Sequence, residues 1–362
     1  MPELYLGLIS GTSLDGIDTA LVEFNPTPRV VFAHSYPLRP ELRAQVLEVI
    51  NNAGTADVAS IGRLDHAFGI AFAWAAEQAM RDAGVSASDV AAIGSHGQTL
   101  WHDPEGEHPF TWQITDANLI AARTGRPVVA DFRRKDMAMC GQGAPLACGY
   151  HREIFASLSP VAVINLGGIA NVTLIRGDEV TGFDTGPANA LTDAWIYAHG
   201  DGSAYDKDGA WAASGVVNED LLERMLAEPY FKAATPKSTG KELFNLAWVE
   251  QHLDGDEAPE NVQATLCELS ARTVAAEVNR AGVEHAIVVG GGAHNPELLR
   301  RLETNLESAR LETSAAHGHD PDFIEAACFA WLAHQRMKAL PGNVATVTGA
   351  SAETILGGLY LP

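Results

Sequence analysis

The first hydrophobic pattern along the chain consists of three short extended segments followed by a helix. Apolar residues dominate residues 4–10, 17–24 and 30–36, and turn-forming residues separate these runs. Pro40 then stands where a helix would begin, because proline fits the first helical turn. The pattern predicts a strand–strand–strand–helix unit whose first hairpin has glycine, hydroxyl and aspartate residues at its tip.

The same order recurs in the middle of the chain. Apolar segments at 161–165, 171–175 and 180–184 precede a helical stretch that opens at Pro187, and the first hairpin turns at Gly167-Gly168. Two copies of one arrangement indicate an internal structural repeat. The alternative is that two unrelated glycine turns occur in an ordinary α/β protein.

The remaining segments alternate between helix and strand. A three–four spacing of apolar residues from Ile61 to Ala79 predicts an amphipathic helix whose aromatic residues belong to the core. The other predicted elements are strands at 90–94, 128–131 and 286–289, a helix from Pro296 and a final helix over 322–337. This order indicates an α/β fold, and 362 residues are enough for two or three domains with their own cores.

Composition and charge narrow the classes of partner. An apolar content of 46% and a charged content of 19% are typical of a folded, soluble protein. A net charge of −22 argues against nucleic acid, whose phosphates would be repelled. It does not exclude ATP, because backbone amides and bound Mg²⁺ can supply local positive potential.

Cysteine, histidine and apolar runs indicate a cytoplasmic protein without a dedicated zinc site. The four cysteines (Cys140, Cys148, Cys267 and Cys328) show no CxxC spacing, which fits free thiols in a reducing compartment. The thirteen histidines form no HExxH motif. The start of the chain lacks a secretion signal, and no apolar run reaches the roughly 18 residues of a membrane helix.

The tip of the first hairpin has the composition of a polyphosphate site. Glycine lets the backbone approach a ligand, while successive amides and hydroxyls form a concave anion site. The candidate nucleotide-binding residues of this tip are Gly11, Thr12, Ser13, Leu14, Asp15, Gly16, Ile17 and Asp18. Gly167 and Gly168 of the second hairpin would grip the phosphates from the opposite side of a central cleft.

A third glycine segment follows a late strand. Gly290, Gly291 and Gly292 come after the apolar run 286–289 and before the helix at Pro296. The third glycine of a dinucleotide fingerprint is missing, so we reject an NAD site. Bare glycine backbone can instead lie against an adenine or a ribose.

Polar residues after two other strands are candidates for binding the second substrate. His96, Gln98 and Thr99 follow the strand at 90–94 and offer donors and acceptors for a hydroxylated ligand, although a histidine after a strand is often structural. Arg133 lies in a run of three basic residues and could hold a carboxylate or phosphate as a bidentate fork. The alternative for that run is surface solvation.

Asp184 is the candidate for the chemical step. It ends a predicted strand and precedes a predicted helix, so it could cap that helix. Alternatively, its carboxylate could act as a general base beside a transferred phosphate. Lys237 and Lys241 follow in a segment without the GxxxxGK[ST] spacing of a P-loop, and either is a candidate for the mouth of the site.

Several motifs together resemble one family over essentially the whole chain. They are SGTSLDGID, SHGQT, ADFRRKD, NLGGIANVT, FDTGPANALTDAW, DKDGAW, KSTGKELFN and VVGGGAHN, in that order. The chain is similar to the anhydro-N-acetylmuramic acid kinases. It departs from their usual pattern at Ile9, where methionine is common, and at Ala188, where glycine is common and a slightly altered turn beside Asp184 is expected.

The resemblance implies a duplicated actin-like (ribonuclease H-like) sugar-kinase fold, in which two domains close over a central cleft. We expect one domain over residues 1–130 with a return at about 338–362, and the other over 131–337. The implied cofactors are ATP and Mg²⁺. The metal ligand stays open, with Asp15 and Asp18 as candidates.

The implied acceptor is 1,6-anhydro-N-acetylmuramic acid, a small molecule from peptidoglycan recycling. Its O6 is tied into the anhydro bridge, so the reaction would hydrolyse the bridge and phosphorylate O6. By similarity, Asp184 would activate the water and Glu325 would assist. Arg133 would pair with the lactyl carboxylate, and His96 and Thr99 would bind hydroxyl or acetamido groups.

Two other classes of protein remain as alternatives. Another small-molecule kinase of this fold would use Asp184 to deprotonate an ordinary hydroxyl or carboxylate, and no water would enter its product. A nucleotide-switched binding protein would instead use ATP to drive assembly, but the chain has no added interaction domain. The oligomeric state stays open, with a homodimer as one alternative.

Overall fold

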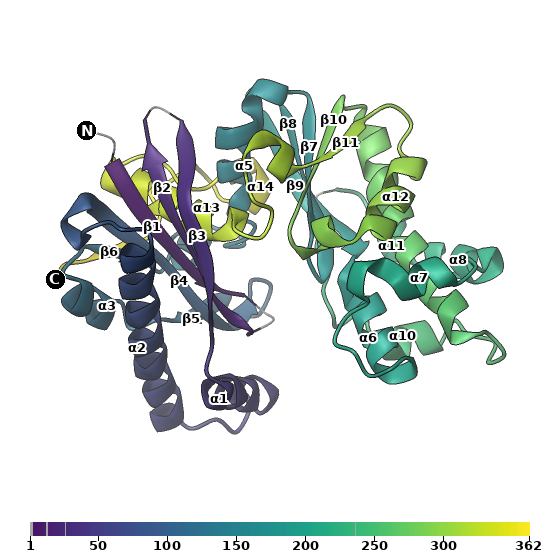
Figure 1. Cartoon of the computed structure of the whole chain (residues 1–362), viewed down its shortest axis with the longest axis horizontal. Coiled ribbons are helices and arrows are strands. Elements are labelled where there is room, and N and C mark those ends of the chain that lie inside the picture. Colours follow the sequence, from purple (N-terminus) through teal and green to yellow (C-terminus); the bar gives the residue numbers. More distant parts are fainter. Residues whose placement is uncertain (1–2, 12–13, 26, 236) are drawn as a thin grey trace. The chain divides into compact units, whose positions relative to one another are not determined.

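A computed structural model describes residues 3–11, 14–25, 27–235 and 237–362, and these form two compact units (Figure 1). The first unit extends to Ile154 and takes up the chain again over Phe323–Pro362. The second unit is Phe155–Asp322. In sequence, the second unit is therefore one continuous segment that interrupts the first unit.

The first unit is built on a seven-stranded sheet. Its strands are β1 (Glu3–Ser10), β2 (Gly16–Phe24), β3 (Pro28–Pro37), β4 (Val90–Asp103), β5 (Phe110–Ile114), β6 (Val128–Ala130) and β12 (Gly358–Tyr360). They lie in the order β12-β6-β4-β1-β2-β3, and β5 pairs with the far part of β4. Strands β1, β4 and β6 run parallel, while β1, β2 and β3 form an antiparallel meander.

Helices cover both faces of this sheet (Figure 1). On β1, Leu6 and Leu8 join a core with Phe68 of α2, whereas Gly7 between them lies against Ala326 of α13. Alternate residues of a strand point to opposite faces, so α2 and α13 lie on different sides. The α-helices of this unit are α1 (Pro40–Asn51), α2 (Val58–Asp82), α3 (Ala117–Thr124), α4 (Arg133–Ala138), α5 (Ala147–Phe155), α13 (Ile324–Met337) and α14 (Ala345–Thr348).

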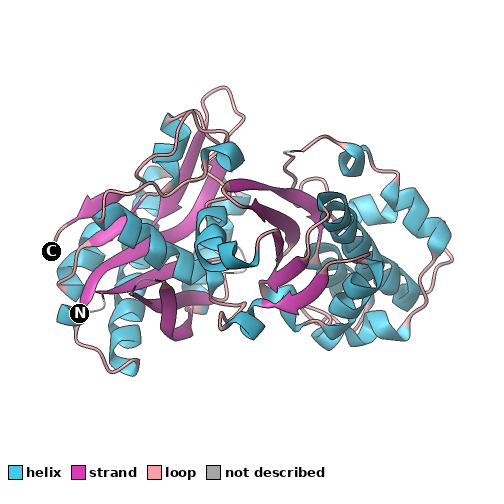
Figure 2. Ribbon diagram, turned by 90° about the horizontal axis from the view of Figure 1, so that it is seen from above, coloured by secondary structure: helices cyan, strands magenta, loops and turns pink. Residues whose placement is uncertain are grey.

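The second unit has a five-stranded sheet in the order β11-β10-β7-β8-β9. Figure 2 colours the strands of the molecule magenta and its helices cyan. Its strands are β7 (Val161–Leu166), β8 (Ile169–Arg176), β9 (Glu179–Pro187), β10 (His285–Val289) and β11 (Arg310–Thr313). Its α-helices are α6 (Asn189–His199), α7 (Ala210–Ser214), α8 (Glu219–Leu226), α9 (Pro229–Lys232), α10 (Leu246–Glu250), α11 (Pro259–Ala281) and α12 (Pro296–Asn305). Ile164 packs in one core with Ala271 of α11 and Leu298 of α12.

The two sheets share one strand order. The sequence β3-β2-β1-β4-β6 of the first unit matches β9-β8-β7-β10-β11 of the second. In the first unit, the central strand β1 pairs antiparallel with β2 and parallel with β4; in the second, β7 pairs antiparallel with β8 and parallel with β10. The predicted internal repeat is confirmed, and the molecule has the predicted duplicated actin-like, ribonuclease H-like fold.

Two predicted elements have different limits in the structure. The strand expected at 90–94 continues to Asp103, because its second half pairs with β5 in an antiparallel ladder. Pro187 does not open a helix; it pairs with Ile169 at the end of β9, and α6 begins at Asn189. His96 and Gln98 therefore lie within β4 rather than in a loop after it, and Asp184 lies within β9 rather than at its end.

The division into units also differs from the expected boundaries. Residues 131–154 and all of α13 belong to the first unit, so the chain returns there at Phe323 rather than at about residue 338. Glycines on the sheet explain this, because Gly7 and Gly94 let α13 lie directly on β1 and β4. A helical pattern in the sequence does not say which sheet the helix covers.

Candidate functional site

The first predicted phosphate-binding segment is the tip of the β1–β2 hairpin. Ile9 pairs with Asp18, and the Leu14 amide donates to the Gly11 carbonyl across the turn at 3.2 Å. Thr12 and Ser13, both predicted to contact phosphate, lie outside the described residues. Leu14 and Ile17 are buried in the core, so they could meet a ligand only through their backbone.

The second predicted segment is the two-residue turn between β7 and β8. The Gly167 carbonyl accepts from the Asn189 amide at 3.0 Å, and the Gly168 carbonyl accepts from the amides of Ala188 and Ala190 at 2.9 and 3.0 Å. The turn is therefore fixed to the first turn of α6. Ala188 makes these contacts with φ −113° and ψ −102°, so the position does not have the positive φ that would favour glycine.

The three late glycines have different roles in packing. A side chain on Gly290 would overlap Asn165, and one on Gly292 would overlap Leu166, so both positions require the bare backbone. Gly291 is exposed and has open space where a Cβ would lie. Only Gly291 of the three thus presents a flat, accessible backbone to a ligand such as an adenosine.

His96 and Arg133 are brought together in the first unit. The Arg133 Nε donates to His96 Nε2 at 3.0 Å, so Nε2 is the unprotonated nitrogen and Nδ1 carries the proton. The His96 Nδ1–H donates to the Gly97 carbonyl at 3.0 Å. Burial and the Arg133 charge hold the pKa of His96 well below its usual range. His96 is therefore a neutral support for Arg133.

Arg133 is oriented by these contacts and keeps its charge. Its Nη1 donates to the Gly143 carbonyl at 2.8 Å, in addition to the bond to His96. Burial lowers the pKa of Arg133, and the charges of Glu325 and of two further groups partly offset that effect. Glu325 itself lies in the first turn of α13, where the sequence predicted it. The alternative of a fully solvated basic run holds for Arg134 and Lys135, which are exposed, but not for Arg133.

Gln98 and Thr99 lie next to one another on β4. The Gln98 Nε2 donates to the Thr99 carbonyl at 3.2 Å, and the Gln113 Nε2 donates to the Thr99 hydroxyl at 3.3 Å. Gln98 is 2% exposed, and its Oε1 has no hydrogen-bond partner among the described residues. A buried acceptor without a hydrogen bond costs free energy. We therefore expect Gln98 Oε1 to accept a hydrogen bond from a ligand.

Asp184 is held in place through both its backbone and its carboxylate. Its amide donates to the Lys237 carbonyl at 3.0 Å, and its carbonyl accepts from the Tyr230 hydroxyl at 2.8 Å. Its Oδ2 accepts from the Thr239 amide at 3.0 Å and from the Ser238 hydroxyl at 3.1 Å. Asp184 therefore does not cap α6, whose first turn receives no side-chain cap.

The surroundings of Asp184 make its carboxylate more basic than usual. Burial raises its pKa, the two hydrogen bonds to Oδ2 lower it, and the negative charge of Glu242 raises it again. The net direction is upward, which is the change a general base working near neutral pH requires. Within the described residues both donors bind Oδ2, so Oδ1 is the oxygen that can accept a proton.

The comparisons with known proteins agree on one family. The family model described as anhydro-N-acetylmuramic acid kinase matches residues 3–362. The chain belongs to the anhydro-N-acetylmuramic acid kinase family. It is 47% identical to the anhydro-N-acetylmuramic acid kinase of Pasteurella multocida, with 98% of this chain and 96% of the relative covered. The enzyme of the same name from Xanthomonas campestris is 48% identical, with 99% and 97% covered.

Solved structures also align over most of the chain. The activator of the 2-hydroxyisocaproyl-CoA dehydratase from Clostridium difficile, with bound ADPNP, covers 93% of this chain and 96% of its own. The identity is 13% and the TM-score is 0.46. A ROK family glucokinase from Streptomyces griseus, in complex with glucose and AMPPNP, aligns with 17% identity and a TM-score of 0.39 over 92% of this chain and 99% of its own.

In this member of the anhydro-N-acetylmuramic acid kinase family, the predicted site residues fall into two groups. The first unit holds the β1–β2 hairpin, His96, Gln98, Thr99, Arg133 and Glu325, and the second holds Gly167, Gly168, Asp184 and Gly290–Gly292. Sequence reasoning missed Ser238 and Thr239, which bind the Asp184 carboxylate. Their signal in the sequence is the hydroxyl pair in KSTGKELFN, which directly follows Lys237.

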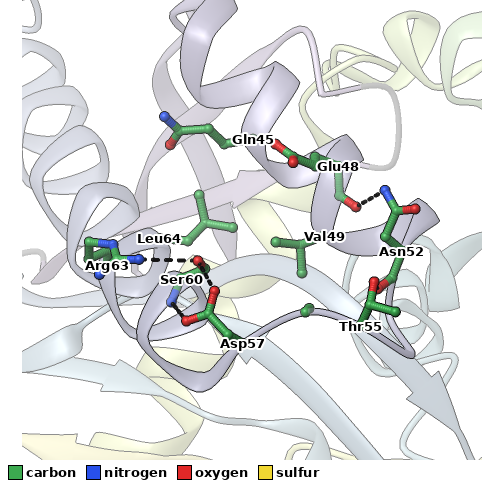
Figure 3. A pocket seen from close by; sticks show the side chains of 10 residues that line it. Gln45, Glu48, Val49, Asn52, Thr55, Asp57, Ser60, Arg63 and Leu64 are labelled. Atoms are coloured by element: carbon green, nitrogen blue, oxygen red, sulfur yellow. Dashed lines mark hydrogen bonds between the residues drawn. The ribbon is translucent and has the colours of Figure 1, made fainter.

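A pocket of about 610 Å³ between α1 and α2 contains none of the predicted site residues (Figure 3). The Ser60 hydroxyl is hydrogen-bonded to Asp57 and to Arg63 there, and these are local contacts at the start of α2.

Within the described ranges, no group of three or more histidine, cysteine or acidic side chains is placed to hold a metal ion. Among the helices of the same ranges, none has both the length and the apolar character needed to cross a membrane.

Proposed function

We propose that this chain uses ATP to convert 1,6-anhydro-N-acetylmuramic acid into N-acetylmuramic acid 6-phosphate and ADP. Membership of the kinase family supports the reaction type, and the names of relatives at 47–48% identity over nearly their full length support the substrate. The observation that carries the mechanism is Asp184. Its position is fixed, its pKa is raised, and Oδ1 is able to take a proton.

The chemistry couples hydrolysis of the anhydro bridge to phosphoryl transfer. Oδ1 of Asp184 takes a proton from water, and the water oxygen forms a bond to C1 of the sugar. The C1–O6 bond breaks, and its electron pair stays on O6. O6 then attacks the γ-phosphorus, the bond from this phosphorus to the bridging oxygen breaks, and ADP leaves with that electron pair.

The other predicted residues take supporting roles in the proposal. Arg133 pairs with the carboxylate of the lactyl group, and His96 holds the guanidinium from behind through its Nε2. Gln98 offers its unpaired Oε1 to a donor of the sugar. Thr99 contacts the sugar beside it, and Glu325 assists at the acceptor end.

The nucleotide residues take the phosphates and the adenosine. The amides and hydroxyls of Gly11–Asp18 and the turn at Gly167-Gly168 bind the phosphates, and the backbone at Gly291 borders the adenosine. Asp15 is exposed and Asp18 is half-buried, and Mg²⁺ is commonly bound by one or two carboxylates together with phosphates. These two residues therefore fit Mg²⁺, which would neutralise phosphate charge when bound.

The proposed cellular location follows from the chemistry of the substrates and of the cysteines. ATP is a cytoplasmic metabolite, and the four cysteines are free thiols, so we place the protein in the cytoplasm, where it would recycle peptidoglycan sugars. A homodimer is our working proposal for its assembly. Light scattering of the purified chain distinguishes it from a monomer.

The reaction in H₂¹⁸O tests this function. With ATP and the anhydro sugar, we expect one ¹⁸O at C1 of the product and phosphate at O6. A phosphorylated product with its anhydro ring intact would contradict the mechanism and favour an ordinary hydroxyl kinase. As the matched variant, Asp184→Asn should lower kcat by roughly 10²–10⁴ because it removes the general base. Its affinity for ATP should stay unchanged.

A further inference from the structure

Lys241 lies beside the glycine turn that we assign to the phosphates. The space above Gly168 is bounded by Cε of Lys241, which would lie 3.4 Å from a Cβ at that position, and by Ala190 of α6. The Lys241 side chain is exposed, so its ammonium group can reach a ligand on that turn.

The backbone that carries Lys241 is firmly held although its side chain is exposed. The Asn245 Nδ2 donates to the carbonyls of Lys241 and Glu242 at 3.2 and 3.0 Å. The Gly240 carbonyl accepts from the Phe244 amide at 3.1 Å, which closes a turn around Lys241. The base of the side chain is fixed, and only the flexible stem is free to adjust.

Lys237, the other lysine of this segment, forms a buried ion pair with Glu277. The Lys237 Nζ lies 3.1 Å from Glu277 Oε1, and both side chains are about 95% buried, with 5% and 4% exposed. It also donates to the carbonyls of Tyr230 and Phe231 at 3.4 and 3.3 Å. Moving this ammonium group to a ligand would leave Glu277 as an unpaired buried charge, which is costly. Lys241 is therefore the lysine of this segment that is available to a ligand.

Acidic groups surround the position of Lys241. Burial raises the pKa of Asp193 in α6 to about 7, and the Lys241 charge opposes that rise. Glu242 follows directly, and its charge reaches Asp184. A triphosphate would be repelled by these carboxylates without a cation among them. A lysine ammonium group is a compact charge that commonly binds phosphate.

We propose that Lys241 contacts the terminal phosphates of the bound nucleotide and gives the site its preference for a triphosphate over a monophosphate. This inference rests on the proposed function, because it takes the phosphates to lie at Gly167-Gly168. Ser238 and Thr239 of the same segment hold Asp184. One segment thus carries both the residues that position the base and the cation that meets the phosphate.

Binding of ATP, ADP and AMP to the intact chain tests the role of Lys241, measured by isothermal titration calorimetry with Mg²⁺ present. Lys241→Met should weaken ATP binding by roughly 10- to 100-fold, the range for losing a hydrogen bond to a charged group. AMP binding should change by less than about twofold. Lys232→Met is the matched control, because Lys232 is an exposed lysine of the same unit, and it should leave all three affinities unchanged.

The outcomes separate this inference from the proposed function. Equal losses for ATP, ADP and AMP in Lys241→Met, or no loss for any of them, would overturn the role of Lys241. Lys241→Arg should recover part of the ATP affinity, since it restores the charge. If the unaltered chain binds ATP but does not phosphorylate the anhydro sugar, the proposed substrate is wrong, and the nucleotide data still decide the role of Lys241.

Discussion

Asp184 combines the two properties that a general base needs, a fixed position and a raised pKa. Four contacts with Tyr230, Lys237, Ser238 and Thr239 fix it, and all four partners come from one stretch of the second unit. Two opposing influences then set its basicity, because hydrogen bonds lower the pKa while burial and Glu242 raise it. The segment after α9 therefore tunes the candidate base.

This opposition predicts two pH shifts of opposite sign. The base must be deprotonated to act, so log kcat falls as the pH drops through the pKa of Asp184. Ser238→Ala removes a bond that lowers this pKa, so its acid limb should move to higher pH. Glu242→Gln removes a charge that raises the pKa, so its acid limb should move to lower pH. Profiles of kcat between pH 4 and 8 measure both shifts, and two unchanged profiles would show that Asp184 does not set the limb.

At the scale of elements, the contact of α13 with the sheet depends on glycine. Gly7 on β1 and Gly94 on β4 lie in neighbouring strands and pair in register. A Cβ on either would overlap a backbone oxygen of α13, that of Ala326 or of Phe329. These glycines let the helix backbone approach the strands, and α13 carries Glu325 at its start.

Gly94→Ala should therefore destabilise the protein by about 1–3 kcal/mol or more, because the overlap is with backbone that cannot rotate away. Urea unfolding measures the change. Gly62→Ala is the control, since Gly62 is exposed in α2 with nothing within 4 Å of a new Cβ. It should stabilise by roughly 0.5–1 kcal/mol, as glycine is a poor helix former. Equal effects of the two substitutions would contradict this packing argument.

At the scale of the molecule, one unit is built from two separated parts of the chain. The segment Phe323–Pro362 returns to the first unit and supplies α13 and the edge strand β12. The second unit has its own apolar core around α11 and is continuous in sequence. Of the two units, only the first depends on the C-terminal segment for its fold.

A chain that ends at Asp322 should lose the first unit and keep the second. Without α13, the apolar positions that it covers on β1 and β4 are exposed to water, which removes part of the driving force for folding. Hydrogen exchange should show protected amides in β7, β8 and β10 and none in β1 and β4. A chain that ends at Gly357 is the control, because it lacks only β12 and the two residues after it and should protect both sheets. Protected β1 amides in the shorter chain would contradict the prediction.

Local pattern was enough to predict much of the fold. The three strands of each repeat and the helix around Phe68 follow from alternation and three–four spacing, which depend only on neighbours in sequence. The limits that were wrong, at Asp103 and at Pro187, depend on pairing with β5 and β8. Such pairing extends a strand past the point where its own apolar pattern ends.

The candidate site divides in the same way. By itself, the sequence determined the family and the duplicated order of elements, and it was enough to choose Asp184, Arg133 and the glycine turns as candidates, because those features are carried by contiguous motifs. Only the tertiary structure decided what these residues do to one another. Ser238 is 54 residues from Asp184, and Arg133 is 37 residues from His96. Contacts over such separations are set by the packing of whole elements, and so are the burial and the pKa shifts that follow from them.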